Sequence, residues 1–480
     1  MKNIHSIKSF GTVFVLLCAA LAVSAQETLR TGYFLKGNSY RYRINPAVMN
    51  EQNFISLPVY GNVNIATTGN VGLSSFVYDA PNGTDLVTFM HPSVSADDFL
   101  GTLDGENRIT ADIDLTLLSA GFKAFGGYNT IDIGVHSRTG VNVPYSMFEF
   151  MKVMGSKDYT IRGLNVTSSN YVDMALGHSR RITKSMTVGA RLKFLLGLGY
   201  ADVMFDRIDV SMNNRQWLVN AQGTANIALG GAFKHNKERL VNDNPVVEGY
   251  EDISLGLNGF GVGLDLGITY DLSNVLTEGL VVSVSLNDLG FMNWKKVSKA
   301  SISHDTPFVF DGFDNIAVHD DVPGTNIEDQ FEGLKDDLEE FFSLEDKGKG
   351  SESKMLSATL NVGAEYIMPF YKKMSVGALY TGRFDKLYPL HKFSLMLNVA
   401  PVKWFELAVS GTAANTGTGF GALANIHCTG FNLFVGTDCF VGKVNNQCIP
   451  LDNMNASVSF GINIPFGKKG YNKKVVAVEQ

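Results

Sequence analysis

The sequence predicts an all-β protein, a transmembrane antiparallel β-barrel of roughly 14 strands with an N-terminal plug segment. Three observations lead to this prediction. Apolar residues alternate with small or polar residues over unusually long segments, the composition is rich in glycine and poor in charge, and an export signal precedes these segments. Glycine accounts for 49 of 480 residues, aromatic residues for 11% and charged residues for 18%. A barrel wall with one lipid-facing and one inward face produces this mixture.

Alternation is clearest between Met186 and Ala201. The even-numbered positions there are all apolar, whereas the odd-numbered positions are small, polar or charged apart from Leu195. A strand that crosses a membrane at a tilt needs about nine to eleven residues, whereas strands of soluble sheets have about five or six. Helical periodicity would scatter these apolar residues around an axis instead. The same alternation recurs at residues 259–270, 356–368 and 456–466.

Shorter candidate strands fill much of the remaining chain. They lie at residues 109–125, 130–138, 171–182, 217–229, 280–286, 374–384, 393–399, 405–409, 420–426 and 431–435. In the first of them the apolar phase changes at Leu117-Leu118, which predicts a β-bulge. The stretch from Phe205 to Asp271 does not give a consistent up-and-down order, so one strand there is missed or misassigned. The alternative fold is a large soluble β-sandwich, whose apolar stripes would be shorter.

Residues 1–25 form a predicted signal peptide. Two lysines precede a short apolar run from Gly11 to Ala22, and Val23-Ser24-Ala25 supplies the small residues of a cleavage site, so Gln26 would be the mature N-terminus. The apolar run is too short for a transmembrane anchor. Removal of the two lysines changes the formal net charge from −7 to −9.

Three other segments depart from the alternation. Residues 26–60 are polar and aromatic and precede the predicted barrel at residues 61–466, so they form the predicted plug-like segment. Residues 311–354 form a long acidic insertion, in which apolar residues from Ile327 to Phe341 recur at helical spacing. Residues 467–480 form a predicted periplasmic tail.

Four charged residues are candidate lumen charges. Arg191 and Lys193 are inward by phase, and they could pair with Asp265 or Glu365, which are also inward by phase. Charges along the lumen tune the selectivity of pores. Charges of opposite sign also satisfy one another without a functional role, and this simpler explanation is favoured.

The composition and motifs argue against several other classes of protein. An acidic chain lacks the basic face that a nucleic acid requires. The sequence contains no nucleophile elbow or phosphate-binding loop, so it predicts no enzyme, no catalytic residue and no cofactor site. Three cysteines follow the signal peptide, namely Cys428, Cys439 and Cys448, and they allow at most one internal disulfide. Their spacing is not that of a zinc site, so no metal is predicted.

Two binding sites of lower weight remain open. His178, Arg180 and Arg181 lie beside a tight turn and could bind a phosphate or a lipid head group, although basic residues at a membrane rim are the simpler explanation. Acidic pairs in the insertion could coordinate Ca²⁺. They lack the spacing of an EF-type loop, so a solvated loop is favoured there.

Three motifs occur in order along the chain: Asn45-Pro46-Ala47, the run from Ser285 to Phe291 followed by Trp294, and the closing run from Gly461 to Gly467. Together they resemble an uncharacterised family of Bacteroidota outer-membrane β-barrel proteins. That family is similar to the long-chain fatty-acid transporter barrels and to the barrel subunit of the type IX secretion machinery. In those transporters an Asn-Pro-Ala segment belongs to an N-terminal plug, and the resemblance therefore implies that residues 26–60 fold into the lumen. The acidic insertion and the C-terminal extension depart from the transporter pattern.

The barrel pattern and the resemblance favour a transporter of a hydrophobic or amphiphilic small molecule, surrounded by the lipid of the bacterial outer membrane. The alternative is a non-transporting scaffold that binds partner proteins through the 311–354 insertion, because an amphipathic helix can dock in a groove. Substrate-dependent uptake into liposomes would support transport, whereas a stable co-purifying protein without uptake would support the scaffold.

Export can be tested on the native protein. We expect it to fractionate with outer membranes, to begin at Gln26 on N-terminal sequencing, and to show heat-modifiable mobility on gels, because a signal peptide is removed on export. Recovery from the soluble periplasm would contradict the barrel.

Overall fold

The computed structural model describes residues 29–79, 81, 86–153, 157–212, 217–241, 244–254, 256–303, 308–310, 344–428, 430–440 and 455–467. The predicted signal peptide, the predicted helical repeat from Ile327 to Phe341 and nearly all of the predicted tail lie outside these residues. Within the described ranges, no helix is long and apolar enough to cross a membrane.

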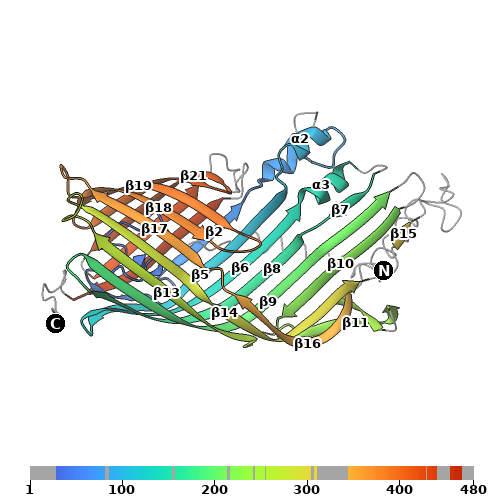
Figure 1. Cartoon of the computed structure of the whole chain (residues 1–480), viewed down its shortest axis with the longest axis horizontal. Coiled ribbons are helices and arrows are strands. Elements are labelled where there is room, and N and C mark those ends of the chain that lie inside the picture. Colours follow the sequence, from blue (N-terminus) through green and yellow to red (C-terminus); the bar gives the residue numbers. More distant parts are fainter. Residues whose placement is uncertain are drawn as a thin grey trace.

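Fourteen strand positions form a closed antiparallel ring, so the predicted antiparallel β-barrel is confirmed (Figure 1). Thirteen of the positions, in ring order, are β5 (Glu106–Ala124), β6 (Gly127–Pro144), β8 (Leu164–Arg181), β9 (Met186–Met212), β13 (Gly259–Asp271), β14 (Leu280–Ser303), β17 (Thr359–Ile367), β18 (Met374–Arg383), β19 (Leu390–Val402), β20 (Phe405–Ala414), β21 (Gly417–Cys428), β22 (Phe431–Phe440) and β23 (Ala456–Phe466). The fourteenth position is shared by two short strands, β1 (Asn53–Ser56) and β2 (Val63–Gly69).

The ring closes at β1 and β2. Each of these strands pairs with β23 on one side and with β5 on the other. Asn53 lies opposite Phe466, and Val63 lies opposite both Phe460 and Leu115. An unpaired backbone group in hydrocarbon costs several kcal/mol, so a sheet in a membrane is stable only when no edge is left open.

The two rims of the ring differ in their connections. β5 and β6 are joined by Phe125-Gly126, whose φ angles of 55° and 72° are those of a two-residue hairpin turn. Short turns also join β8 to β9, β17 to β18, β19 to β20 and β21 to β22 on this short-turn rim. The turn from β13 to β14 also lies on this rim. The opposite, long-loop rim carries the connections that contain η2 (Leu73–Ser75), β3 (Val77–Asp79), β4 (Leu86–Thr88), α2 (Ala96–Leu100), α3 (Tyr145–Lys152) and β7 (Tyr159–Ile161). In outer-membrane barrels the short turns face the periplasm and the long loops face outward.

The alternation places apolar side chains on the outside of the ring. Leu192 and Phe194 are 43% and 45% exposed, whereas Arg191 and Lys193 between and beside them are buried. The same holds on the neighbouring strand β13, where Leu266 is exposed and Asp265 is fully buried. Exposed apolar residues on a continuous wall match a lipid-facing band. The predicted phase of these strands is therefore correct.

On one side of the long-loop rim the sheet continues beyond the ring, and we call this part the sheet extension (Figure 1). β9 pairs with β13 as far as Gly197 and with β10 from Tyr200 onward. β14 pairs with β17 through Asn287 and with β16 from Phe291 onward. The strands added in the extension are β10 (Trp217–Ala228), β11 (Ala232–Val241), β12 (Asn244–Glu251), β15 (Phe308–Phe310) and β16 (Leu344–Met355).

The extension corrects two sequence predictions. The strand predicted at residues 217–229 exists as β10, but it belongs to the extension and not to the ring. The ring position missing from the prediction is that of β1 and β2, and β1 falls inside the predicted plug-like segment 26–60. The partner exchange along β9 and β14 explains why no consistent strand order could be assigned between Phe205 and Asp271.

Two further details concern local structure. The bulge predicted at Leu117-Leu118 is confirmed, because the register of β5 against β6 shifts between Thr116 and Leu118. The last part of the predicted 311–354 insertion differs from the expectation, since Leu344–Met355 is strand β16 and pairs with β14.

The lipid-facing band can be tested at Leu192, which lies between Leu176 and Leu264 in register. Leu192→Arg places a charge among lipid-facing side chains and should lower the free energy of unfolding in vesicles by about 2–4 kcal/mol if the site is near the midplane. Leu276→Arg, in a short turn and 72% exposed, is the matched control and should cost about 0–1 kcal/mol. Equal losses would mean that Leu192 does not face lipid.

Candidate functional site

Residues 29–50, which we call the N-terminal segment, lie inside the ring. The segment contains one 3-10 turn, η1 (Arg41–Arg43), and is otherwise built of turns and irregular chain. Its hydrogen bonds reach opposite sides of the wall, from β5 and β6 through β13 and β14 to β20 and β22. Most of its side chains are buried as a result.

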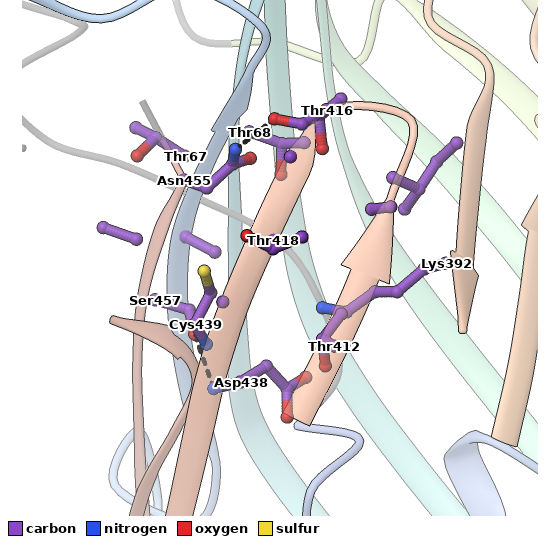
Figure 2. A pocket seen from close by; sticks show the side chains of 16 residues that line it. Thr67, Thr68, Lys392, Thr412, Thr416, Thr418, Asp438, Cys439, Asn455 and Ser457 are labelled. Atoms are coloured by element: carbon purple, nitrogen blue, oxygen red, sulfur yellow. Dashed lines mark hydrogen bonds between the residues drawn. The ribbon is translucent and has the colours of Figure 1, made fainter. Parts of the chain in front are cut away.

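The start of the segment is held by carboxylates of the wall. Asp438 on β22 accepts hydrogen bonds from the backbone N–H groups of Arg30 and Thr31, at 2.7 and 2.6 Å. The backbone N–H of Asp438 in turn donates to the Ser457 hydroxyl at 2.8 Å (Figure 2). Glu406 on β20 accepts from the N–H of Gly37 at 3.0 Å. Inward polar side chains thus satisfy backbone groups that an irregular buried chain would otherwise leave unpaired.

The Asn45-Pro46-Ala47 turn lies against two glycines of the wall. The Asn45 side-chain oxygen accepts from the backbone N–H of Ala47 at 2.9 Å, and its amide donates to carbonyls of β13 and β14 at 3.2 and 3.4 Å. Gly189 and Gly267 face each other in register on β9 and β13. A methyl group at Gly189 would collide with the Pro46 carbonyl, and one at Gly267 would collide with the Asn45 side chain. Glycine therefore allows the close approach of this turn to the wall.

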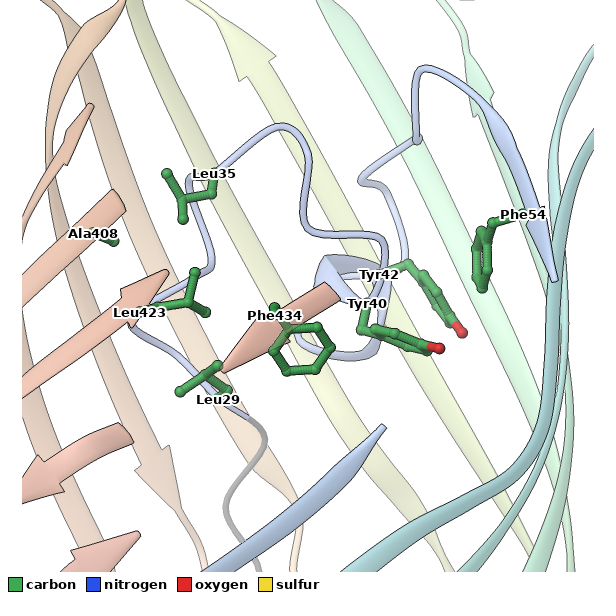
Figure 3. Close-up of a cluster of buried hydrophobic side chains, with 8 residues drawn as sticks. All are labelled: Leu29, Leu35, Tyr40, Tyr42, Phe54, Ala408, Leu423 and Phe434. Atoms are coloured by element: carbon green, nitrogen blue, oxygen red, sulfur yellow. The ribbon is translucent and has the colours of Figure 1, made fainter. Parts of the chain in front are cut away.

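The segment also buries apolar side chains against the wall. A first cluster lies on one side of the lumen (Figure 3), with Leu29, Leu35, Tyr40, Tyr42, Phe54, Ala408, Leu423 and Phe434. A second cluster contains Tyr33, Phe34, Ile44, Leu379 and Met396. Both clusters combine side chains of the N-terminal segment with inward side chains of the wall, so the segment is held by hydrophobic burial as well as by hydrogen bonds.

Arg43 connects the segment to carboxylates of β5 and β6. Its Nη1 lies 3.3 Å from Asp114, and its Nη2 lies 3.7 Å from Asp132. The neighbouring Tyr42 hydroxyl donates to Asp132 at 2.6 Å and lies 2.8 Å from the hydroxyl of Ser119. All of these side chains are buried, so charge and hydrogen bonding act here in a medium of low dielectric constant.

The ion pairs continue along the inward face of the wall. Arg191 lies 3.2 Å from Asp132 and 3.3 Å from both Asp173 and Asp265. Lys193 lies 2.8 Å from Asp265 and 2.6 Å from Asp288. His136 Nε2 lies 2.7 Å from Asp173, and its Nδ1 lies 3.7 Å from Asp114. We call this set the central charge cluster, which comprises Arg43, Asp114, Asp132, His136, Asp173, Arg191, Lys193, Asp265 and Asp288.

A separate group of two arginines and two aspartates, with balanced charge, lies nearer the long-loop rim. Arg138 Nε lies 3.2 Å from Asp112, and its Nη2 lies 3.9 Å from Asp385, while Arg383 lies 3.8 Å from Asp112. Asp385 is in the loop after β18, and burial acts to raise its pKa. Arg138, the Ser357 hydroxyl and two backbone N–H groups outweigh that effect, so the pKa of Asp385 lies below its ordinary value.

An aromatic and apolar layer lies beside the central charge cluster on the side of the long-loop rim. The His136 and Tyr171 rings stack at 5.0 Å, and the Tyr200 and Trp294 rings stack at 5.1 Å. Trp294 covers Gly197, where β9 exchanges partners. We call this set the aromatic layer, which comprises Tyr171, Leu195, Tyr200, Ala228, Met292, Trp294, Val297 and Leu356.

Two small cavities lie on opposite sides of the N-terminal segment. One of about 30 Å³ is at the long-loop rim, and Lys392, Asp438 and Cys439 are among the residues that line it (Figure 2). The other, of about 10 Å³, is toward the short-turn rim and is lined in part by Tyr42 and Arg191. A water molecule needs about 10–15 Å³ of such space, so neither cavity accommodates an organic solute.

The structure brings three of the four candidate lumen charges together. Arg191, Lys193 and Asp265 form direct ion pairs, whereas Glu365 forms none with any described residue. Asn45, Pro46 and Ala47 lie at the glycine pair described above. His178, Arg180 and Arg181 lie at the end of β8, on the short-turn rim, and within the described ranges no group of side chains fits a metal ion. Cys428 is a free thiol, and Cys448 lies outside the described residues.

Most carboxylates of the central charge cluster were not among the residues predicted from the sequence. Asp114, Asp132 and Asp173 occupy inward positions of β5, β6 and β8. The phase argument that identified Arg191 and Lys193 would have identified these carboxylates as well, had it been extended to the three strands. The role of Tyr42 and Arg43 could not be found in this way, because the N-terminal segment has no alternating pattern.

Comparisons with known proteins give one family and several distant structural likenesses. The model of a family of unknown function, DUF5723, matches residues 46–438. The chain is similar to the toluene transporter TodX of Pseudomonas putida, at 10% identity and a TM-score of 0.38 over 89% of this chain and 93% of that one. For the toluene transporter TbuX of Ralstonia pickettii the identity is 10% and the TM-score is 0.39, over 88% of this chain and 92% of that one. For a FadL homologue of Pseudomonas aeruginosa the identity is 10% and the TM-score is 0.38, over 92% of this chain and 99% of that one.

No curated protein matches the chain.

The central charge cluster can be tested at Asp265, which is fully buried and pairs with both Arg191 and Lys193. Asp265→Asn removes the shared counter-charge of two buried cations and should lower the free energy of unfolding by about 3–5 kcal/mol. Asp206→Asn, at an exposed position of β9, is the control and should change it by less than about 0.5 kcal/mol. A loss at Asp265 no larger than the control's would mean that the ion pairs are solvated.

Proposed function

The chain belongs to DUF5723, a family of unknown function, and we propose that it is an outer-membrane channel for a hydrophobic or amphiphilic small molecule, closed by its N-terminal segment. The observation that carries the proposal is the position of this segment inside a closed ring. In this proposal residues 29–50 act as a plug, and the inward side chains that hold them line the path of the solute.

The size of the ring supports a channel. A barrel of about eight strands is narrow enough for its own side chains to fill the interior, and barrels of about 16–18 strands leave an aqueous pore. With fourteen strand positions, this ring lies between those cases, and the N-terminal segment takes up the remaining space. Departure of the segment would leave a continuous lumen.

The way the segment is held supports its departure. Residues 29–50, all of which the structure describes, form no β-ladder with the wall. Their contacts are hydrogen bonds to inward side chains and to a few carbonyls of the wall, ion pairs and the two apolar clusters. The segment can therefore leave without breaking a backbone hydrogen bond of the ring, and the membrane-spanning sheet stays closed.

The substrate class has two supports. The sequence resemblance to fatty-acid transporter barrels implies an apolar or amphiphilic solute. The aromatic layer places Leu195, Trp294 and Tyr171 on the path between the long-loop rim and the central charge cluster, and pockets for organic ligands are lined in this way, with few polar groups. The central charge cluster would then contact the polar end of the solute.

A second candidate function is a scaffold for partner proteins at the outer membrane. The sheet extension favours it, because β10, β14 and β16 project beyond the ring on the long-loop side and form a surface that a partner protein could contact (Figure 1). Uptake by purified protein in liposomes separates the two functions, since only the channel requires it.

The plug can be tested by locking it to the wall. Thr31 and Ser410 carry hydroxyls 2.8 Å apart, so in a variant with the native cysteines replaced by serine, Thr31→Cys with Ser410→Cys should form a disulfide. We expect oxidised protein to show no uptake of an apolar fluorescent solute by proteoliposomes, and reduction to restore it. Deletion of residues 29–50 should raise single-channel conductance in planar bilayers.

Each single-cysteine variant is the control for the lock, because oxidation alone should not change its uptake. Uptake that persists in the locked protein, or unchanged conductance of the folded deletion variant, would exclude the N-terminal segment as the plug.

A further inference from the structure

We propose that the central charge cluster is a binding site for the cationic group of the transported amphiphile, and that Arg43 fills this site while the N-terminal segment is in place. The proposal rests on the proposed channel function and deepens it by assigning the charge of the substrate. A guanidinium or an ammonium group is the chemistry that the site would take.

The charge balance of the wall is the first argument. In the central charge cluster the wall contributes five carboxylates, but only Arg191 and Lys193 as permanent cations, so it carries an excess of three negative charges. His136 adds one positive charge only when it is protonated. Arg43 reduces the excess without removing it. The site therefore attracts a cation, and no counter-charge for an anion is left over.

The ion pairing of Asp114 depends directly on the N-terminal segment. Within the described parts of the chain, the ion-pair partners of Asp114 are Arg43 and His136. When the N-terminal segment leaves, this buried carboxylate keeps only the histidine and the lumen water. A buried charge without a partner is strongly unfavourable, so a solute cation that replaces Arg43 stabilises the open wall.

Arg43 is held mainly by electrostatic attraction and less by directed hydrogen bonds. Its Nε and Nη2 form no hydrogen bond with the described residues, although the side chain is buried. The distance of 3.7 Å between Nη2 and Asp132 is that of a loose ion pair. The site is not built for the two-pronged geometry of an arginine, and a compact ammonium group would satisfy the same carboxylates.

The aromatic layer continues from this site and fits the apolar part of the same molecule. His136 belongs to the central charge cluster and stacks on Tyr171, which belongs to the aromatic layer. A ligand with its cation among Asp114, Asp132 and Asp173 would thus extend its apolar chain toward Trp294. A fatty-acid carboxylate in the same position would meet like charges, so the wall selects against the head group of the resembled transporters' substrates.

The site can be tested by chemical rescue in the full chain. Arg43→Ala should lower the melting temperature followed by gel mobility, and millimolar methylguanidinium should restore most of the loss. Methylurea, a neutral molecule of similar shape, and sodium chloride at equal ionic strength should not. Rescue should disappear when Asp114→Asn is added. Absence of rescue, or equal rescue by methylurea, would overturn the proposal, and refolding yield with the same additives gives the result if Arg43→Ala does not survive purification.

The substrate assignment is tested on the variant that lacks residues 29–50. Dodecylguanidinium should bind at least about tenfold more tightly than dodecanoate below their micellar concentrations, and Asp114→Asn with Asp132→Asn should remove the difference. Equal or tighter binding of dodecanoate would overturn the cation site and leave the channel function standing. Binding of neither amphiphile would overturn both.

Discussion

Closure of the sheet at β1 and β2 is the constraint on which the rest of the molecule depends. A wall in lipid cannot leave a strand edge unpaired, and here the last edge is covered by the strands that directly follow the N-terminal segment along the chain. The segment therefore reaches the lumen from the seam itself. One of its ends is fixed to the ring by β1 at Asn53, and the other is held by Asp438 near the long-loop rim. Any movement of the segment is that of a tethered chain.

Glycine on the inward face serves this arrangement. At Gly189 and Gly267 the wall gives room to the backbone of Pro46 and Ala47. At Gly377 it gives room to the ring of Phe34 in the same way. Larger side chains at these positions would fill a fourteen-strand lumen from the wall, and the space for a removable segment would be lost. The glycine content that predicted a barrel from composition is thus explained in part by what the barrel contains.

The sequence predicted the ring almost completely, because alternation is a local signal that survives without any knowledge of partners. It failed at two places, each for its own physical reason. β10 alternates like a wall strand, and only the exchange of partners along β9 shows that it lies outside the ring. β1 has four residues, too few for a period to be recognised. In the candidate site, phase placed Arg191, Lys193 and Asp265 on the inward face, but the contacts of Tyr42 and Arg43 depend on an irregular segment whose path no periodicity specifies.

The excess of carboxylates in the lumen is not needed to hold the wall together. The strands are already paired, and buried ion pairs contribute little net stability when well-packed apolar residues could replace them. Because of the excess of carboxylates, the closed state depends on a cation. With the segment in place Arg43 supplies it, and in an open barrel water, ions or a solute must supply it instead. A solute that brings its own cation competes with Arg43 for the same carboxylates, so entry of the solute and release of the segment become one exchange reaction.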